Sequence, residues 1–443
     1  MAHNIDVSAF VVLRKGKTCR CVKFAQPKQE GCIEKLKFSY EGAVGFPFGS
    51  TFEVKGRQLH RCDPHAERQH AEALSEASPN EGPSTSCGNS FGERDNRDIV
   101  DSRGASQNMP SESIIEMKDR GERGASLVNQ IVENSETFCV KNKYSQAKYV
   151  RRKIRKHGDV ITILRPTIRL LCDIFYSKDS EKIGCLRSDT LSAIIGYSNV
   201  RHNAKVIVVE GCAGLVSSAV VERLGGSGTC IHLHKGPRPQ AIPAFEAMNF
   251  TTRCLETFAP VPISALFHGL NDYSNVFKMM SRNQASKLNE DTKTDGTSDS
   301  LEMKKWDSNG QPEQLNSLKS TFIDIPLNEA QTANLKLLET SQFDALIIAA
   351  PVGHPLPLLQ SLVNKLSLSR PFVLYHRYQE PLVECFTWLR EQCIAVNVTL
   401  IDIFARHYQV LPAQTHPEMT QQLASGYILH GYFVEKSSNG LLE

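Results

Sequence analysis

The sequence of 443 residues lacks the features that mark secreted, membrane-spanning and zinc-binding proteins. Its 13 cysteines include no Cys-x-x-Cys pair, so neither a zinc ribbon nor a disulfide framework is indicated, and a reducing compartment is expected. No run of 18 apolar residues occurs, which excludes a transmembrane helix. The first residues show no basic segment followed by an apolar one, so we expect no secretion signal. A mean hydropathy of −0.30 indicates a globular protein with polar insertions.

Acidic residues are missing from one segment, residues 141–157, which contains eight Lys or Arg. The whole chain has a net charge of +3, so its remainder carries about −5. A local cationic patch on a nearly neutral protein predicts a polyanionic partner. The residues expected to contact phosphates are Lys143, Lys148, Arg151, Arg152, Lys153, Arg155 and Lys156. The alternatives are a solvated helix face and a nuclear-import signal at residues 151–156. Tyr144 and Tyr149 stack on bases or pack against the protein, and packing is the expectation.

Composition divides the chain into folded regions and polar stretches. Short β-rich segments broken by Gly, Pro and Lys-rich turns predict a small β-barrel domain at residues 1–60. Residues 61–108 form a polar linker that we expect to be disordered. A helical hairpin followed by the basic segment is predicted for residues 109–158. Alternating strands and helices at residues 159–443 predict a doubly wound, Rossmann-like α/β domain, interrupted by a disordered polar insertion at about 280–325.

Within the α/β domain, the first strand is expected at residues 159–164, and a buried parallel strand at residues 205–210 runs into a glycine-containing turn. Two strands near the C-terminus, at about 396–401 and 426–434, are expected to form an antiparallel pair. In a doubly wound fold, ligands bind at the carboxyl ends of the strands, at the point where the strand order reverses. A cofactor site is therefore expected at the turn of residues 211–214.

The turn departs from the pattern that a cofactor requires. Methyltransferases of this architecture commonly show Glu-x-Gly-x-Gly-x-Gly here, because the backbone must approach S-adenosylmethionine where a side chain would clash. The three glycine positions hold Cys212, Gly214 and Val216, so two bulky side chains should intrude on the cofactor space. His234 stands where a carboxylate would bind the ribose hydroxyls, and the strand ending at Ala349 lacks the carboxylate of catalytic relatives. We predict a degenerate site, no bound cofactor and no catalytic residue.

Two histidines of the next strand, His232 and His234, share one face of it. They are expected to be ordinary strand residues, since a metal pair lacks a third ligand at a suitable spacing. No metal site is therefore predicted. Asp344 lies at the start of its strand, the wrong end for catalysis, and is expected to be a cap.

Several short stretches of the sequence, taken together, show a family resemblance that covers nearly the whole chain. The chain resembles the non-catalytic subunit of the eukaryotic tRNA (adenine-58-N1)-methyltransferase. Any one matching stretch is weak, but the set in this order is specific. The stretches are Gly-Ser-Thr-Phe-Glu-Val at 49–54, Asp-Asn-Arg-Asp-Ile-Val-Asp at 95–101, Ile-Val-Glu-Asn-Ser-Glu-Thr-Phe at 131–138, Gln-Ala-Lys-Tyr at 146–149, Cys-Ala-Gly-Leu at 212–215, Ser-Arg-Pro-Phe-Val at 369–373, Gln-Glu-Pro-Leu-Val-Glu-Cys at 379–385, Tyr-Gln-Val-Leu-Pro at 408–412 and Thr-His-Pro at 415–417.

The resemblance implies a β-domain followed by a methyltransferase-like domain that has lost cofactor binding. It implies a nuclear heterotetramer of two such chains and two catalytic chains, with tRNA bound across the subunits and S-adenosylmethionine in the catalytic partner. The chain is then not itself an enzyme, but holds tRNA while N1-methyladenosine is made at position 58 of the T-loop. The alternatives are an active S-adenosylmethionine-dependent RNA methyltransferase with a divergent site and a free-standing RNA-binding protein.

Two further features are candidates for partner contacts. Arg377, just beyond the strand at 371–375, is a weaker RNA-binding candidate, with a surface salt bridge as the alternative. The paired strands near the C-terminus, together with residues 406–412, are the candidate subunit interface, because apolar edge strands that face no core must be covered.

Overall fold

The computed structural model describes residues 4–26, 29–34, 36–62, 108–119, 124–135, 137–138, 143–234, 242–266, 328–350, 353–410, 415–419 and 425–436. The chain divides into two compact units, Met1–Pro166 and Thr167–Glu443, and each is described by itself. Residues 63–107 of the predicted linker and the whole predicted insertion at about 280–325 lie outside the described residues.

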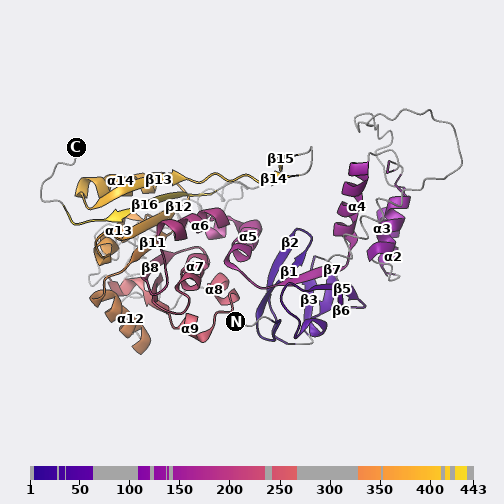
Figure 1. The fold of residues 1–443 in the computed structure, drawn as a ribbon, viewed down its shortest axis with the longest axis horizontal. Helices are drawn as coiled ribbons and strands as arrows, with labels where there is room; N and C mark the ends of the chain where they lie inside the picture. The colour runs from indigo at the N-terminus through magenta and orange to yellow at the C-terminus, as the bar shows by residue number, and fades with distance from the viewer. Residues whose placement is uncertain are drawn as a thin grey trace, which may run out of the picture. The chain divides into compact units, whose positions relative to one another are not determined.

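The first unit is built on an antiparallel sheet of five strands in the order β2-β1-β7-β5-β6, which are all labelled in Figure 1. These are β1 (Phe10–Lys15), β2 (Thr18–Lys23), β5 (Thr51–Lys55), β6 (Gln58–Cys62) and β7 (Val160–Leu164). A separate hairpin is formed by β3 (Glu30–Ile33) and β4 (Leu36–Ser39), followed by the short helix η1 (Glu41–Ala43). In the described residues the sheet is open, with β2 and β6 at its edges, so the closed barrel that we predicted is not found there.

One face of this sheet carries the core of the first unit. Alternate residues of the strands point to the same face, and those of β1, β5 and β7 are branched or aromatic. The β3–β4 hairpin and its flanks add aromatic rings, with Phe38 and Tyr40 edge to face at 5.4 Å. The fully or nearly fully buried members of this core include Val11, Leu13, Phe24, Phe38, Tyr40, Phe52, Val54, Ile161 and Ile163.

The strand β7 corrects the predicted domain boundary. The sequence predicts a strand here but assigns it to the α/β domain, as part of residues 159–443. The structure places β7 between β1 and β5, with Leu13 opposite Ile163 and Phe52 opposite Ile161. The alternation of Ile161 and Ile163 matches the half-buried antiparallel sheet rather than a strand buried on both faces. The first unit therefore ends at Pro166.

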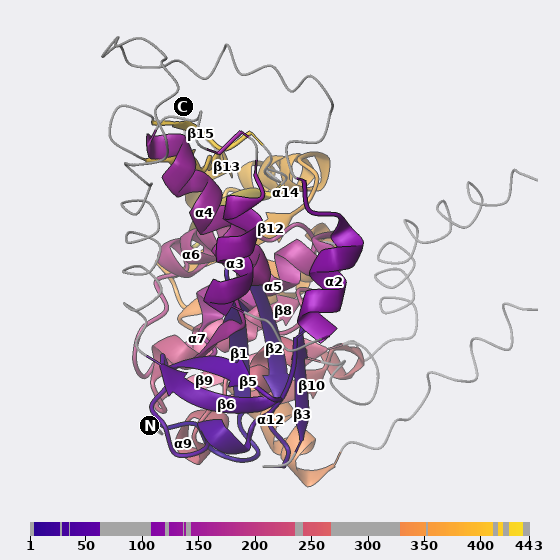
Figure 2. The ribbon, with the colours of Figure 1, turned by 90° about the vertical axis from the view of Figure 1, so that its right-hand side faces the viewer.

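Three helices precede β7: α2 (Ser111–Asp119), α3 (Gly124–Glu133) and α4 (Lys143–His157). They correspond to the predicted hairpin and basic segment. Met117 of α2 packs against Leu127 and Ile131 of α3, whereas Val132, at the end of α3, packs with Val150 of α4. The helix α3 thus contacts both of its neighbours (Figures 1 and 2).

The second unit contains a seven-stranded sheet in the order β10-β9-β8-β11-β12-β16-β13 (Figure 1). The first five strands are parallel, and β16 lies antiparallel between β12 and β13. The bounds are β8 (Lys205–Glu210), β9 (Thr229–His234), β10 (Phe258–Pro262), β11 (Ala345–Ala349), β12 (Pro371–His376), β13 (Ala395–Asp402) and β16 (Tyr427–Phe433). The continuous apolar runs of β8 and β11 fit strands covered on both faces. The predicted doubly wound α/β fold is confirmed in this unit, and so is the antiparallel C-terminal pair.

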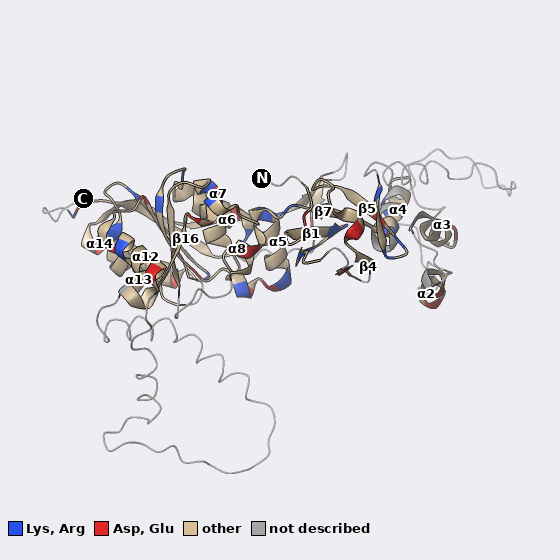
Figure 3. Ribbon diagram, turned by 90° about the horizontal axis from the view of Figure 1, so that it is seen from below, with Lys and Arg blue, Asp and Glu red and all other residues tan. Residues whose placement is uncertain are grey.

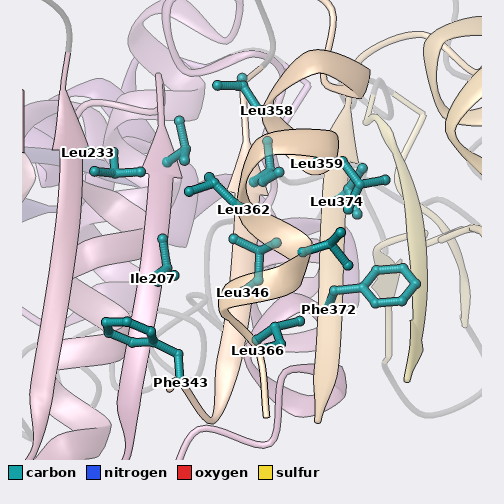
Figure 4. Close-up of a cluster of buried hydrophobic side chains, with 14 of the residues drawn as sticks. Ile207, Leu233, Phe343, Leu346, Leu358, Leu359, Leu362, Leu366, Phe372 and Leu374 are labelled. Atoms are coloured by element: carbon teal, nitrogen blue, oxygen red, sulfur yellow. The ribbon is translucent and has the colours of Figure 1, made fainter. Parts of the chain in front are cut away.

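Helices cover both faces of this sheet. One face packs against α12 (Glu329–Thr340), α13 (Leu356–Leu362) and α14 (Glu380–Gln392). Figure 4 shows Leu358, Leu359 and Leu362 of α13 above Leu346 and Leu374. The other helices are α5 (Ile168–Asp179), α6 (Ser188–Tyr197), α7 (Leu215–Leu224), α8 (Pro243–Ala247) and α9 (Thr252–Leu255), with the short η3 (Glu181–Ile183), η4 (Ile263–Leu266) and η5 (Val363–Lys365).

An arm leaves the sheet after β13 (Figure 1). We define the arm as residues 403–410 and 415–419. Within it, β14 (Tyr408–Gln409) pairs with β15 (His416–Pro417), and the Glu418 N–H donates to the His407 carbonyl at 2.9 Å. The chain returns to the sheet at Ser425 and Gly426, before β16. Among the described residues, no helix is both long and apolar enough to cross a membrane.

Candidate functional site

The predicted cofactor site lies at the carboxyl edge of the second sheet, where β8, β9 and β11 end side by side. Ala349 is opposite Glu210, and Leu233 is opposite Val209, so the strand ends are in register. The order reverses between β8 and β11, which makes this the switch point of the sheet. Three predicted residues lie on or beside the turn after β8 (Cys212, Gly214 and Val216), and two end the neighbouring strands (His234 and Ala349).

The turn itself packs against a later part of the same chain. Ala213 and Gly214 both have left-handed backbones, with φ of +58° and +84°. A Cβ added to Gly214 would lie 2.8 Å from the Cβ of Ile242 and 3.2 Å from that of Phe245. The glycine is therefore required for close packing within the protein, and the space that it frees is occupied by the chain's own side chains.

The short helix α8 holds these side chains in place. Its Ala244 N–H donates to the carbonyl of Ala213 at 3.1 Å. The ring of Phe245 stacks obliquely on Phe258 of β10, with centroids 4.3 Å apart, and also contacts Phe250 at 5.1 Å. We call Ile242, Phe245 and Phe258 the plug. Beside Gly214 it places apolar atoms, and the Ala213 carbonyl is already used in a hydrogen bond.

The N-terminus of α7 is also satisfied from within. Glu210 accepts hydrogen bonds from the backbone N–H groups of Val216 at 3.1 Å and Ser217 at 2.7 Å. Such N–H groups are the ones that anionic ligands use at a helix N-terminus. Burial raises the pKa of Glu210, while the hydrogen bonds from Ser217 and Val216 act in the opposite direction. The Glu210 carboxyl group thus caps the first turn of α7.

Both histidines of β9 are buried in the second unit. His232 Nδ1 and the Ser217 hydroxyl share a hydrogen bond of 2.8 Å, and both residues are buried. Burial lowers the pKa of His232 to about 4, so its imidazole is neutral at pH 7. The His234 ring lies 6.3 Å from that of His232, and it is buried as well. No group of three metal-ligating side chains occurs in the part of the chain that the structure describes.

The backbone carbonyl of Ala349, at the end of β11, is hydrogen-bonded to the turn that follows β8. It accepts from the Gly211 N–H at 2.9 Å and from the Cys212 thiol at 3.7 Å. Burial raises the pKa of Cys212 far above its usual range, which keeps the sulfur protonated and unreactive. At the opposite edge, Asp344 accepts from the Lys205 N–H at 3.0 Å and pairs with Arg370 at 3.2 Å. Asp344 therefore links the starts of two strands, at the edge of the sheet opposite the cofactor turn.

The basic segment forms the helix α4, of which three predicted cations have described side chains. Lys148 and Arg152 are exposed, and Lys153 is half-buried with its ammonium 5.1 Å from the centre of the Tyr149 ring. Tyr149 packs on Phe138 at 5.7 Å, which agrees with the packing expectation for this tyrosine. Lys143, Arg151, Arg155 and Lys156 lie on the same helix, but their side chains, like that of Tyr144, lie outside the described residues.

The helix α4 is held by contacts on its apolar side. Its buried Val150 packs with Phe138, and Gln146 Nε2 donates to the Phe138 carbonyl at 3.1 Å. Exposed Lys148 and Arg152 are four residues apart and so lie on one face of the helix. The second unit, in contrast, shows Lys and Arg interspersed with Asp and Glu in Figure 3. Anchoring on one side and cations on the other make α4 the candidate nucleic-acid surface.

Arg377 is paired rather than free. Its Nη2 lies 3.2 Å from Glu181 Oε1 in η3, and its guanidinium lies over the ring of Tyr378 at 5.6 Å. The salt-bridge alternative is therefore the one that the structure shows for this residue. An RNA phosphate would have to compete with Glu181 for the guanidinium.

The arm exposes large apolar side chains. Phe404 and Val410 are each 75% exposed, Met419 is 88% exposed and Tyr408 is 53% exposed. Monomeric soluble proteins seldom expose such residues together, so a cluster of them marks an interaction site. Next to the root of the arm lies a surface groove of about 1080 Å³ between α5, α6 and α7, in whose lining none of the predicted cofactor residues appears.

The plug and the Glu210 cap were not found from the sequence. Glu210 has a local signal, since it precedes the α7 N-terminus by a few residues, as capping carboxylates do. Ile242 and Phe245 have no such local signal, because they lie some thirty residues beyond the turn in the sequence and contact it only in the folded chain.

The model of the Gcd10p family matches residues 4–306 of the chain. Over 466 aligned residues the chain is 31% identical to the mouse (Mus musculus) tRNA (adenine(58)-N(1))-methyltransferase non-catalytic subunit TRM6, covering 98% of this chain and 90% of that relative. It is 32% identical to the Dictyostelium discoideum protein described as the same subunit, covering 77% of this chain and 64% of that relative. Among solved structures, the tRNA (m1A58) methyltransferase TrmI from Aquifex aeolicus aligns at 9% identity with a TM-score of 0.43, covering 98% of this chain and 100% of that one.

Proposed function

The chain belongs to the Gcd10p family, and from this premise we propose that it is the non-catalytic, tRNA-binding subunit of a methyltransferase that makes N1-methyladenosine at position 58 of tRNA. The observation that carries the proposal is the filled cofactor position. Glu210 caps α7, and Ile242 and Phe245 occupy the space beside Gly214. Such a turn has lost the room that S-adenosylmethionine needs, so the cofactor and the chemistry belong to a catalytic partner.

The substrate explains why a complex would need a second, non-catalytic chain. Adenine N1 lies on the Watson–Crick edge, so the T-loop must be opened and the base presented unpaired. A tRNA is gripped mainly by shape and backbone, which requires a large surface. We propose that this chain enlarges that surface in a nuclear heterotetramer of two such chains and two catalytic chains.

The helix α4 is the proposed tRNA contact. Lys148 and Arg152 are exposed on one face, Lys153 adjoins it, and the opposite side of the helix is anchored through Val150 and Gln146. Rigid presentation of cations favours binding because fewer side chains must be ordered when a phosphate is bound. Lys143, Arg151, Arg155 and Lys156 are proposed to extend this contact along the helix, and Arg377 remains a weaker candidate.

The arm and the edge strand β13 are the proposed contact with the catalytic subunit. The strand β13 has eight residues and stands at the edge of the seven-stranded sheet in the described residues. Exposed edge strands and exposed apolar clusters are both surfaces that soluble proteins normally cover. Val396 and Tyr432 near this edge, and Phe404, Tyr408 and Val410 on the arm, are all exposed.

A methyl-transfer assay tests the proposed function. Unmodified tRNA and labelled S-adenosylmethionine are incubated with the purified chain, with the purified catalytic subunit and with both together. We expect no label in tRNA from this chain alone and full transfer from the pair. Transfer by this chain alone would restore the alternative of an active enzyme. Equal activity of the catalytic subunit with and without this chain would remove the proposed supporting role.

A further inference from the structure

Both roots of the arm are attached to one helix, α6. Arg187 precedes the helix and is only 9% exposed. Its Nε donates to Asp189 Oδ1 at 2.9 Å, and its Nη2 donates to Asp189 Oδ2 at 2.7 Å. The same Nη2 donates to the carbonyl of Ile403 at 2.7 Å, where the arm begins. The bidentate pair fixes the plane of the guanidinium and so fixes the direction of this third bond.

The returning end of the arm is held by the first turn of the same helix. The hydroxyls of Thr190 and Ser425 share a hydrogen bond of 2.7 Å, and Thr190 is fully buried. We call Arg187, Asp189 and Thr190 the α6 clamp. It grips the chain at Ile403 and at Ser425, on either side of the exposed arm residues.

The helix that carries the clamp is itself fixed in the core. Leu191, Ile194 and Ile195 of α6 are buried, and the helix packs on β12. The segment before it is tied down by the Tyr375 hydroxyl, which donates to the Gly184 carbonyl at 2.7 Å. Arg187, Asp189 and the arm residues Ala405 and His407 also line the groove beside the arm. The clamp therefore connects a rigid element to a projecting one.

We propose that the α6 clamp orients the arm for docking with the catalytic subunit, and that Arg187 and Thr190 are positioning residues for assembly. This inference rests on the proposed function, in which the arm contacts that subunit. A projecting segment that is ordered in advance loses less conformational entropy on binding than a free one. The clamp supplies this order without touching the partner.

The test uses two clamp variants and one matched control in the full chain. Arg187→Gln removes the charged bond to Ile403, and Thr190→Val removes the bond to Ser425 with little change in shape. Arg370→Gln is the control, since Arg370 also pairs with an aspartate, Asp344, but at the opposite edge of the sheet. Thermal unfolding, followed by tryptophan fluorescence, shows whether each variant keeps the fold of the second unit.

The first measurement needs no partner. Chymotrypsin cleaves after Phe404 and Tyr408, and the cleavage rate reports how often the arm detaches. We expect Arg187→Gln to raise the rate roughly tenfold, because a hydrogen bond from a charged group is lost, and Thr190→Val to raise it by a smaller factor. Arg370→Gln should leave the rate unchanged. Unchanged cleavage in both clamp variants would overturn the clamp.

The second measurement is the dissociation constant for the purified catalytic subunit. We expect Arg187→Gln to weaken it roughly tenfold, and Arg370→Gln to leave it unchanged. Faster cleavage of Arg187→Gln combined with an unchanged dissociation constant would overturn the docking role, because loosening the arm would then have no effect on the affinity for the catalytic subunit. That outcome would leave the methyl-transfer result intact, so failure of the inference is distinguishable from failure of the proposed function.

Discussion

At the scale of single residues, the two glycines that bracket α7 provide a test of the plug. Gly214 and Gly225 both have positive φ, but a Cβ at Gly225 would meet only His202 Nδ1 at 3.6 Å, whereas at Gly214 it would meet Ile242 at 2.8 Å. Gly225→Ala should lower the unfolding free energy of the second unit by about 1 kcal/mol, from backbone strain alone. Gly214→Ala should lower it by about 3 kcal/mol, because overpacking is added.

Denaturant unfolding followed by tryptophan fluorescence measures this difference. Trp388 lies on α14 of the second unit, so its fluorescence reports on the relevant part of the chain, whereas Trp306 lies outside the described residues. An equal loss of unfolding free energy in the two variants would mean that the side chains beside Gly214 move easily to make room for a methyl group. The interpretation of that space as filled would then be wrong.

His232 gives the second residue-scale prediction, a dependence of stability on pH. Its pKa is about 4 in the folded protein against 6.5 for the ordinary value, because burial disfavours the charged ring. Between these values the unfolded chain binds the proton and the folded chain does not, so folding loses stability as the pH falls. The stability is fully present above pH 6.5, and the loss reaches on the order of 3 kcal/mol by pH 4.

The comparison for this prediction is His232→Asn, whose side-chain amide can still bond to Ser217 but does not titrate. The difference in unfolding free energy between the wild type and the variant should shrink or reverse as the pH is lowered from 7 to 4. A difference that stays constant over this range would show that His232 does not titrate as its burial requires.

At the scale of elements, the helix α4 should carry the salt dependence of tRNA binding. The triple variant Lys148→Gln, Arg152→Gln, Lys153→Gln removes the cations whose side chains are described on this helix. The slope of the logarithm of affinity against the logarithm of salt concentration should flatten by roughly 2 to 3, if each cation contacts one phosphate. Fluorescence anisotropy of labelled tRNA over a salt series measures the slope.

A control for α4 replaces three exposed lysines of the second unit, Lys178, Lys182 and Lys336, by glutamine. It changes the net charge by the same amount but leaves the helix intact. An equal loss of slope in the control and in the α4 variant would indicate a general charge effect and would refute α4 as the RNA surface.

Elements also show how far the sequence determines the fold. The parallel run of β8, the alternation in β7 and the basic helix were all predicted, because each is a local pattern of period 2 or 3.6 or a continuous apolar run. The sheet to which β7 belongs was not predicted correctly. Alternation shows which residues of a strand face a core, but it does not show which strands lie beside that strand. Its partners β1 and β5 lie far earlier in the chain, since Val12 pairs with Leu164 and Phe52 with Ile161.

The candidate site also contains residues that could be predicted from the sequence and residues that could not. Cys212, Val216, His234 and Ala349 were singled out because each departs from a local pattern at a known place in the fold. The residues that fill the space, Ile242 and Phe245, follow no pattern that could be read locally. A missing ligand-binding group is visible in a sequence, whereas the group that replaces it is visible only in the structure.

At the scale of the whole molecule, the helix proposed to contact tRNA and the cofactor position belong to different units. The cationic helix belongs to the first unit, while the filled cofactor turn, the arm and its clamp belong to the second. The even distribution of charge outside residues 141–157 agrees with an RNA contact that is confined to one element. Loss of the cofactor turn can therefore leave the binding surfaces unaffected.

The most direct test of the central claim is calorimetric titration of S-adenosylmethionine into the purified chain, alone and in complex with the catalytic subunit. We expect no binding heat from the chain alone, because Ile242 and Phe245 fill the space beside Gly214 and two glycines of the motif are replaced by Cys212 and Val216. The complex should bind one equivalent for each pair of chains. Micromolar binding by the isolated chain would contradict the account, and this protein would then have to be treated as an active methyltransferase.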